Sequence, residues 1–235
     1  MFVKRLFDQY SSLYKKLIVT APNYDETYKW ISLKQFQDNW DLEAVDFEKM
    51  YDSSFSNEIS SNLWASQFFY PKRVMLQFIK LDQERVRRMF RELFDEQNDN
   101  IGDRIEKFVF QCDIIRDEIQ KTDENFKNHF HDGYRIISVY LSFMFPEKYC
   151  IYKFTEFKDF MTKVDASSIP GTSEIGRFFK VMRTFYKMLS ADKELIKIHK
   201  GLIADKKFYQ GDTLLLAQDF YWCCTREQYS IEKYS

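Results

Sequence analysis

The stretch from residue 129 to residue 157, HFHDGYRIISVYLSFMFPEKYCIYKFTEF, decides the fold. Between residues 133 and 145 it is apolar almost all round, and a helix with so little polar surface is normally buried on most sides. At 100° per residue its polar exceptions share one narrow stripe: Arg135, Ser138 and Ser142. Pro146 ends this helix, because proline cannot donate to the helical hydrogen-bond ladder. The stretch therefore predicts a buried central helix over about residues 133–145.

The residues after Pro146 predict a change of conformation. The run Tyr149-Cys150-Ile151-Tyr152 is aromatic and β-branched, which favours a short extended segment. We therefore expect a short β element near residues 149–153, followed by another helix.

Apolar residues recur at three- and four-residue steps through most of the remaining chain, which is typical of amphipathic helices. The predicted helices cover residues 2–18, 25–36 with Asp25 as N-cap, 41–51, 71–79, 83–95, 103–119, 155–164, 173–190 and 192–204. A helix or a strand–helix unit is expected over 214–224, and a loop or frayed helix anchored by Trp64 over 53–66. The fold class is thus mainly α, one multi-helix domain over residues 1–235, with a candidate subdomain boundary in the linker 165–172.

Composition excludes several classes of protein. Apolar residues make up 45% and charged residues 30% of the 235-residue chain, so it can bury a core and is not disordered. The net charge of −1 argues against a dedicated polyanion binder. The four cysteines lack CxxC or zinc-type spacing, which indicates reduced thiols. With no apolar run of about 20 residues and no signal-peptide pattern, we expect a cytoplasmic protein that does not enter a membrane.

No motif in the chain indicates catalysis. The string from Gly171 to Phe178 has glycines at phosphate-loop spacing, but Arg177 and Phe178 stand where lysine and a hydroxyl belong. A metal held by His129, His131, Asp132 and Glu124 lacks a further ligand at defined spacing, so surface or capping histidines are favoured. We therefore expect no enzyme activity, no metal and no cofactor.

One cluster of cations suggests nucleic-acid contact. Its members are Lys72, Arg73, Arg85, Arg87, Arg88 and Arg91. Arginine suits phosphate contacts, but the pairs Glu84–Arg88, Arg88–Glu92 and Arg91–Asp95 are i,i+4 neighbours that equally describe a solvated helix face. The excess of aromatic residues could include a base-stacking surface, for which the candidates are Trp30, Trp64 and Tyr152.

Several stretches follow one another in a distinctive order: YKWI (28–31), DFEKM (46–50), VRRMFRELFDE (86–96), DRI (103–105), ISVYL (137–141) and FPEKYCIYK (145–153). Over about residues 25–225 this order resembles the N-terminal region that precedes the AAA+ motor in bacterial McrB-type restriction proteins. The most specific part is the segment from Ser138 to Lys153. The chain lacks the motor's Walker A motif, so no NTPase activity carries over.

The resemblance implies a non-catalytic specificity module of a restriction or phage-defence system that recognises DNA, including modified DNA. Its other partner would be the motor domain or a nuclease subunit of the same system. An alternative is a protein–protein adaptor that binds such a subunit through an exposed aromatic patch. A third hypothesis, an aromatic pocket for a small molecule or a modified base, overlaps the first in mechanism.

Overall fold

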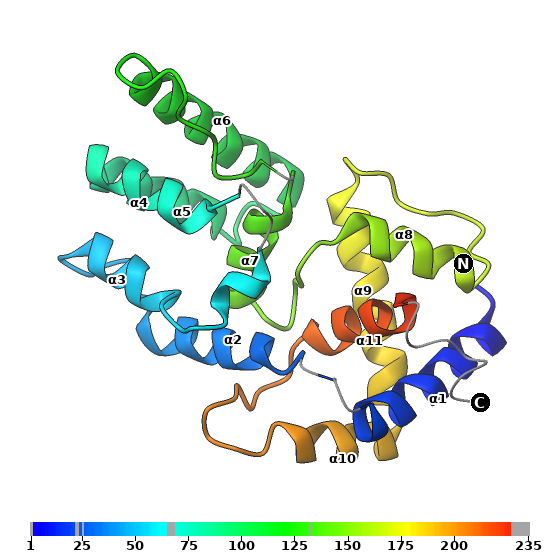
Figure 1. Cartoon of the computed structure of the whole chain (residues 1–235). Helices are drawn as coiled ribbons and strands as arrows, with labels where there is room; N and C mark the ends of the chain where they lie inside the picture. The colour runs from blue at the N-terminus through cyan, green and yellow to red at the C-terminus, as the bar shows by residue number, and fades with distance from the viewer. Residues whose placement is uncertain (1, 22–23, 25, 65–68, 132, 227–235) are drawn as a thin grey trace. The chain divides into compact units, whose positions relative to one another are not determined.

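The computed structural model describes residues 2–21, 24, 26–64, 69–131 and 133–226, and over these residues the chain consists mainly of helices joined by turns and loops (Figure 1). It forms two compact units, one from residues 1–30 and 146–235 and the other from residues 31–145. The prediction of a mainly α-helical fold is confirmed. The linker 165–172 joins α8 to α9 inside the first unit, whereas the divisions between units fall at residues 30/31 and 145/146. The proposed Asp25 cap lies outside the described residues.

The second unit surrounds the central helix that the sequence predicts. Its helices are α2 (Tyr28–Asn39) from its second turn onward, α3 (Phe47–Ser54), the short 3₁₀ helix η1 (Ser60–Leu63), α4 (Pro71–Leu81), α5 (Gln83–Leu93), α6 (Ile101–Gln120) and α7 (Arg135–Met144). In α7 every residue from 136 to 143 is buried. The two serines of the polar stripe are buried as well, and their hydroxyls donate to carbonyls one turn back, at 2.7 Å for Ser138 and 3.1 Å for Ser142, whereas Arg135 is half-buried.

Aromatic rings fill the space around α7. The ring of Tyr140 lies 5.1 Å from that of Phe90 on α5, and its hydroxyl lies 2.7 Å from the hydroxyl of Tyr51 on α3. Phe90 also contacts Trp40 and Phe108, with centroids 5.0 and 5.2 Å apart. Edge-to-face rings at these distances stabilise a core beyond their buried area, by about 0.5–1.5 kcal/mol per pair.

The first unit is built on the C-terminal helix. It contains α1 (Lys4–Thr20), α8 (Phe154–Lys163), α9 (Ile175–Ser190), α10 (Lys193–Leu202) and α11 (Leu215–Thr225), and α11 packs against α1, α8 and α9. At its centre Phe220 of α11 lies 5.0 Å from Phe7 and 4.9 Å from Phe160, measured between ring centroids. The segment 214–224 is thus helical rather than a strand–helix unit.

The expected β element near residues 149–153 is wrong. The residues Cys150, Ile151 and Tyr152 are buried, but within the described chain they have no strand beside them with which to form a ladder. The hydroxyl of Tyr221 on α11 instead donates to the carbonyl of Ile151 at 3.4 Å. Aromatic and β-branched side chains suit this run because it is a buried extended segment that packs on a helix.

A buried ionic cluster ties together the parts of the first unit. Asp219 of α11 is fully buried and accepts from the hydroxyls of Tyr14 and Tyr24, at 2.6 and 2.7 Å, and from the ammonium of Lys29 at 2.9 Å. Burial alone would lower the pKa of Lys29, but the carboxylates of Asp219 and Glu26 outweigh it and raise that pKa. Burial opposes ionisation of Asp219, yet Lys29 and the two hydroxyls hold its pKa below the ordinary value.

We predict that Asp219→Asn lowers the free energy of unfolding by about 3–5 kcal/mol, because it leaves Lys29 buried with one of its two carboxylates gone. Urea denaturation followed by circular dichroism measures this loss. The matched control is Asp8→Asn, which removes the exposed Lys4–Asp8 pair of α1 and should cost less than about 1 kcal/mol. Equal losses in the two variants would show that the buried cluster has no special role.

The second unit holds a buried neutral histidine. His129 is enclosed by rings of Phe78, Phe108, Phe130 and Tyr140, and burial lowers its pKa to about 3. Since an unfolded histidine titrates near 6.5, the unfolded chain binds a proton between pH 6.5 and 3 that the folded chain does not. Stability is therefore lost as the pH falls below 6.5.

Between pH 7 and pH 5 the wild-type chain should lose roughly 2 kcal/mol of unfolding free energy through His129. We expect His129→Gln to lack this part of the loss. The measurement is the urea unfolding free energy of both proteins across this range. The test compares the slopes of unfolding free energy against pH for the two proteins, so it does not depend on the stability of the variant at neutral pH. Parallel pH profiles would contradict a buried neutral His129.

Candidate functional site

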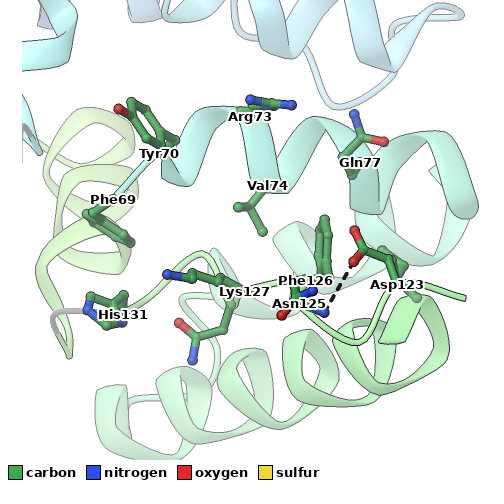
Figure 2. A pocket seen from close by; sticks show the side chains of 12 residues that line it. Phe69, Tyr70, Arg73, Val74, Gln77, Asp123, Asn125, Phe126, Lys127 and His131 are labelled. Carbon is green, nitrogen blue, oxygen red and sulfur yellow. Dashed lines mark hydrogen bonds between the residues drawn. The ribbon is translucent and has the colours of Figure 1, made fainter. Parts of the chain in front are cut away.

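A cavity lies in the second unit, between α4 and the connection from α6 to α7 (Figure 2). Its volume is about 450 Å³, which falls within the usual range for small-molecule pockets of about 300–1,000 Å³. It is lined by Phe69, Tyr70, Arg73, Val74, Gln77, Ile119, Asp123, Asn125, Phe126, Lys127, Asn128 and His131.

Local sequence explains how this pocket forms. Pro71 occupies the first turn of α4, where its missing N–H costs nothing. Tyr70 therefore stands just outside the helix, with 60% of its surface exposed. On the opposite wall the connection after α6 is folded by an Asx turn, in which the backbone N–H of Asn125 donates to the carboxylate of Asp123 at 3.2 Å. The side-chain amide of Gln120 donates to the carbonyl of Phe126 at 2.7 Å and holds that wall in place.

The lining combines three kinds of chemistry. Phe69, Tyr70 and Phe126 supply aromatic rings, and the ring of Phe69 lies 6.0 Å from that of His131. Amide groups come from the Asn and Gln residues, and the buried Oδ1 of Asn128 accepts no hydrogen bond from any described residue. In Figure 2 the side chain of Lys127 runs from the connection toward His131, and Val74 points from α4 toward the same space.

Two cations of the pocket are available to a ligand. Arg73 and Lys127 are exposed, and neither side chain bonds or pairs with another residue in the described ranges. Asp123 provides the pocket's carboxylate. The site therefore offers stacking faces, amide donors and acceptors, and positive charge, and it shows no arrangement of a nucleophile beside a base.

The other cations of the predicted cluster are mostly engaged within the protein. Lys72 pairs with Asp52 at 2.8 Å and donates to the carbonyl of Phe55 at 3.2 Å. Two arginines of α5 pair with residues far away in the sequence: Arg85 with Glu118 of α6 at 2.9 Å, and Arg91 with Glu43 at 2.8 Å. These ion pairs differ from the i,i+4 pairs expected from the sequence.

Arg87 is a structural residue. Its side chain is buried, its Nη1 donates to the carbonyl of Leu42 and its Nη2 to that of Ala44 at 2.8 Å. The guanidinium also lies over the ring of Phe47, 4.7 Å from the centroid. The side chain of its neighbour Arg88 is exposed and bonds to no other described residue. The structure thus separates a cluster that looks uniform in the sequence.

The aromatic residues proposed for base stacking are buried. Trp30 is 0%, Trp64 6% and Tyr152 7% exposed. Tyr152 donates to the carbonyl of Thr172 at 3.1 Å in the first unit, and Trp64 packs its ring against Phe55 in the second. None of the three presents a face to solvent, so any stacking must involve other rings, of which Tyr70 is the most exposed in the pocket.

The two histidines considered as metal ligands lie in different surroundings. His129 is buried beside the thiol of Cys112, with 4.0 Å between Nε2 and Sγ, whereas His131 is exposed. Asp132 lies outside the described residues, and among those described no three His, Cys, Asp or Glu side chains gather closely enough to hold a metal ion. All four cysteines are buried free thiols.

A smaller cavity of about 200 Å³ lies in the first unit, lined in part by Trp30, Tyr186 and His199. Burial lowers the pKa of His199 to about 4, so this imidazole is neutral at pH 7. The volume is below that of ordinary ligand pockets, and the larger cavity is therefore the candidate site.

Sequence reasoning missed most of this pocket. The aromatic and amide residues of the connection 121–134 carry no motif. Its length was the available signal, because helix–helix connections usually have about 2–8 residues and longer ones are often functional. Of the predicted residues the pocket includes only Arg73.

Comparisons of the chain with protein-family models, with curated proteins and with solved structures find no match. Within the described part of the chain, no helix is both long enough and apolar enough to cross a membrane.

Arg87 and Arg88 provide a direct test of how the cations are used. We predict that Arg87→Ala lowers the free energy of unfolding by about 2–4 kcal/mol, because it leaves two carbonyls without a donor and uncovers the ring of Phe47. Arg88→Ala should stay within about 0.5 kcal/mol of the wild type. Urea denaturation of the two neighbouring variants measures both values, and similar losses would contradict the division into structural and free cations.

Proposed function

We propose that this chain is a non-catalytic recognition module that binds DNA by holding a nucleotide in the pocket of the second unit. The observation that carries the proposal is the combination of rings, amides and two unpaired cations around one cavity of about 450 Å³. A nucleobase presents two flat faces and an edge of donors and acceptors, and these are the features that rings and amides recognise.

Each part of a nucleotide has a counterpart in the lining. The exposed ring of Tyr70 and the half-buried ring of Phe126 offer stacking faces, and the buried ring of Phe69 lines the wall beside them. The side-chain amides of Asn125 and Asn128 can exchange hydrogen bonds with a base edge. Arg73 and Lys127 suit the phosphate.

The size of the pocket favours one base over a long stretch of nucleic acid.

The second unit has 15 Lys and Arg against 21 Asp and Glu, a formal charge of −6. Such a unit repels a polyanion at long range, so its contribution is recognition at close range. This is consistent with the specificity module of a restriction or phage-defence system that the sequence resemblance predicts, and cytosine modification is the variable to test first.

The adaptor alternative needs an exposed aromatic patch. The large apolar side chains exposed in the described residues are Val3, Val19, Val45, Tyr70, Leu81 and Phe110, and they come from several different elements. The pocket therefore supports nucleotide recognition better than a patch supports an adaptor.

We predict that Tyr70→Ala weakens binding of a fluorescein-labelled single-stranded 10-mer about 5- to 150-fold, because base–aromatic stacking contributes about 1–3 kcal/mol. Fluorescence anisotropy at 50 mM salt measures the affinity, with oligonucleotides containing cytosine or 5-methylcytosine. Phe110→Ala is the matched control, since Phe110 of α6 is 62% exposed against 60% for Tyr70 but does not line the pocket.

The expected result is a loss in Tyr70→Ala alone, accompanied by a preference for one of the two cytosine forms. Equal affinities in both variants, or no binding by the wild-type chain, would overturn the proposal. In the second case a protein partner becomes the better hypothesis.

A further inference from the structure

The two units carry opposite formal charges, although the whole chain is nearly neutral. The first unit has 20 Lys and Arg against 15 Asp and Glu, a formal charge of +5, and the second unit has −6. The excess arises in one segment, because residues 175–207 hold nine Lys and Arg against three Asp and Glu. This segment comprises α9, α10 and the start of the following loop.

Helix α9 is the most one-sided element of that segment. Its 16 residues, IGRFFKVMRTFYKMLS, include four cations and no acidic residue. Its aromatic residues Phe178, Phe179 and Phe185 are buried in the unit's core. At 100° per residue Arg177, Lys180, Thr184 and Lys187 fall within about 80° of one another on the opposite side, and all four are exposed. We call these four residues the α9 basic face.

The cations of this face differ in how firmly they are held. Arg177 pairs with Glu174 at 2.6 Å just before the helix. Arg183, at the edge of the face, donates to the carbonyl of Lys148 at 3.0 Å. Lys180 and Lys187 make no side-chain bond or ion pair with any residue that the structure describes. Burial raises the pKa of Tyr186, which follows Phe185 on the helix, and the nearby carboxylates of Asp212 and Glu147 raise it further.

We propose that the α9 basic face binds the phosphate backbone of a nucleic-acid duplex. The face runs about 15 Å along the helix axis from residue 177 to 187, a length that spans several phosphates of a duplex. Thr184 stands between the cations, and its short side chain lets the helix approach a backbone closely. Its hydroxyl is already engaged with the carbonyl of Lys180 at 3.1 Å, so the lysines supply the contacts.

Other polyanionic or apolar partners fit this face less well. A membrane-binding helix buries exposed apolar side chains beside its cations, and a protein interface usually has an aromatic or Met anchor at its centre. None of the large apolar side chains exposed in the described residues belongs to α9. Single strands are gripped by stacked rings, whereas this face presents charge alone. Contacts of that kind position a duplex without reading its sequence.

This inference rests on the proposed nucleic-acid recognition and adds the surface that supplies long-range attraction, which the acidic second unit lacks.

The test is fluorescence anisotropy of a labelled 20-base-pair duplex of arbitrary sequence, in salt from 50 to 200 mM. Replacing Lys180 and Lys187 by Gln should reduce the slope of log affinity against log salt by about 1.8, since each phosphate contact contributes about 0.9. The affinity at 50 mM salt should fall at least tenfold.

The matched control is Lys4→Gln/Lys158→Gln, which removes the same charge from exposed positions on α1 and α8 of the same unit. An unchanged slope in Lys180→Gln/Lys187→Gln, or an equal change in the control, would overturn the inference. So would a double variant that keeps its affinity for the duplex but loses binding to vesicles containing phosphatidylserine. Tyr70→Ala separates the two proposals, because loss of a stacking ring leaves the duplex salt slope unchanged whereas loss of the lysines does not.

Discussion

The buried ion pair between Lys29 and Asp219 is the constraint on which the first unit depends. Taking two charges out of water is costly, and the pair is tolerated because its remaining bonding capacity is filled by Tyr14, Tyr24 and Glu26. The five residues come from α1, from the segment after it, from α2 and from α11. The cluster therefore fixes how residues near the two ends of the chain meet, and packing of the rings around Phe220 follows from that arrangement.

The helices could be predicted because their signals are local. Periodic apolar residues and the capping side chains Asp82, Asn100 and Asp192 specify α5, α6 and α10. The buried central helix could be predicted for the same reason, since an all-round apolar run has only one stable environment. The extended run 149–153 could not, because whether such a run forms a ladder depends on a neighbouring strand that may be far away in sequence.

The site was much less accessible to sequence reasoning. Arg87 and Arg88 are adjacent and chemically identical, but the helix directs one into the carbonyls of residues 42 and 44 and the other into solvent. Asp219 and Lys29 lie 190 residues apart, so their pairing could not be read from spacing. The pocket residues of the connection 121–134 carry no catalytic or ligand-binding motif. Charge was misleading for another reason: a total of −1 conceals units of +5 and −6.

This division of charge unites the two proposals. Close-range recognition of a base requires rings and amides but little net charge, and the second unit provides them. Long-range attraction requires unpaired cations on an exposed face, and α9 of the first unit provides them. The resemblance to the N-terminal region of McrB-type restriction proteins stays a prediction, and it agrees with a chain that recognises DNA while another component supplies the motor or nuclease.

The central claim is that the pocket of the second unit holds a nucleotide, and amide hydrogen exchange tests it most directly. The exchange of backbone amides would be followed with and without a saturating single-stranded oligonucleotide. The account predicts added protection in residues 69–77 and 119–131, which form the two walls of the pocket. Protection confined to other segments, or no change at saturation, would contradict it.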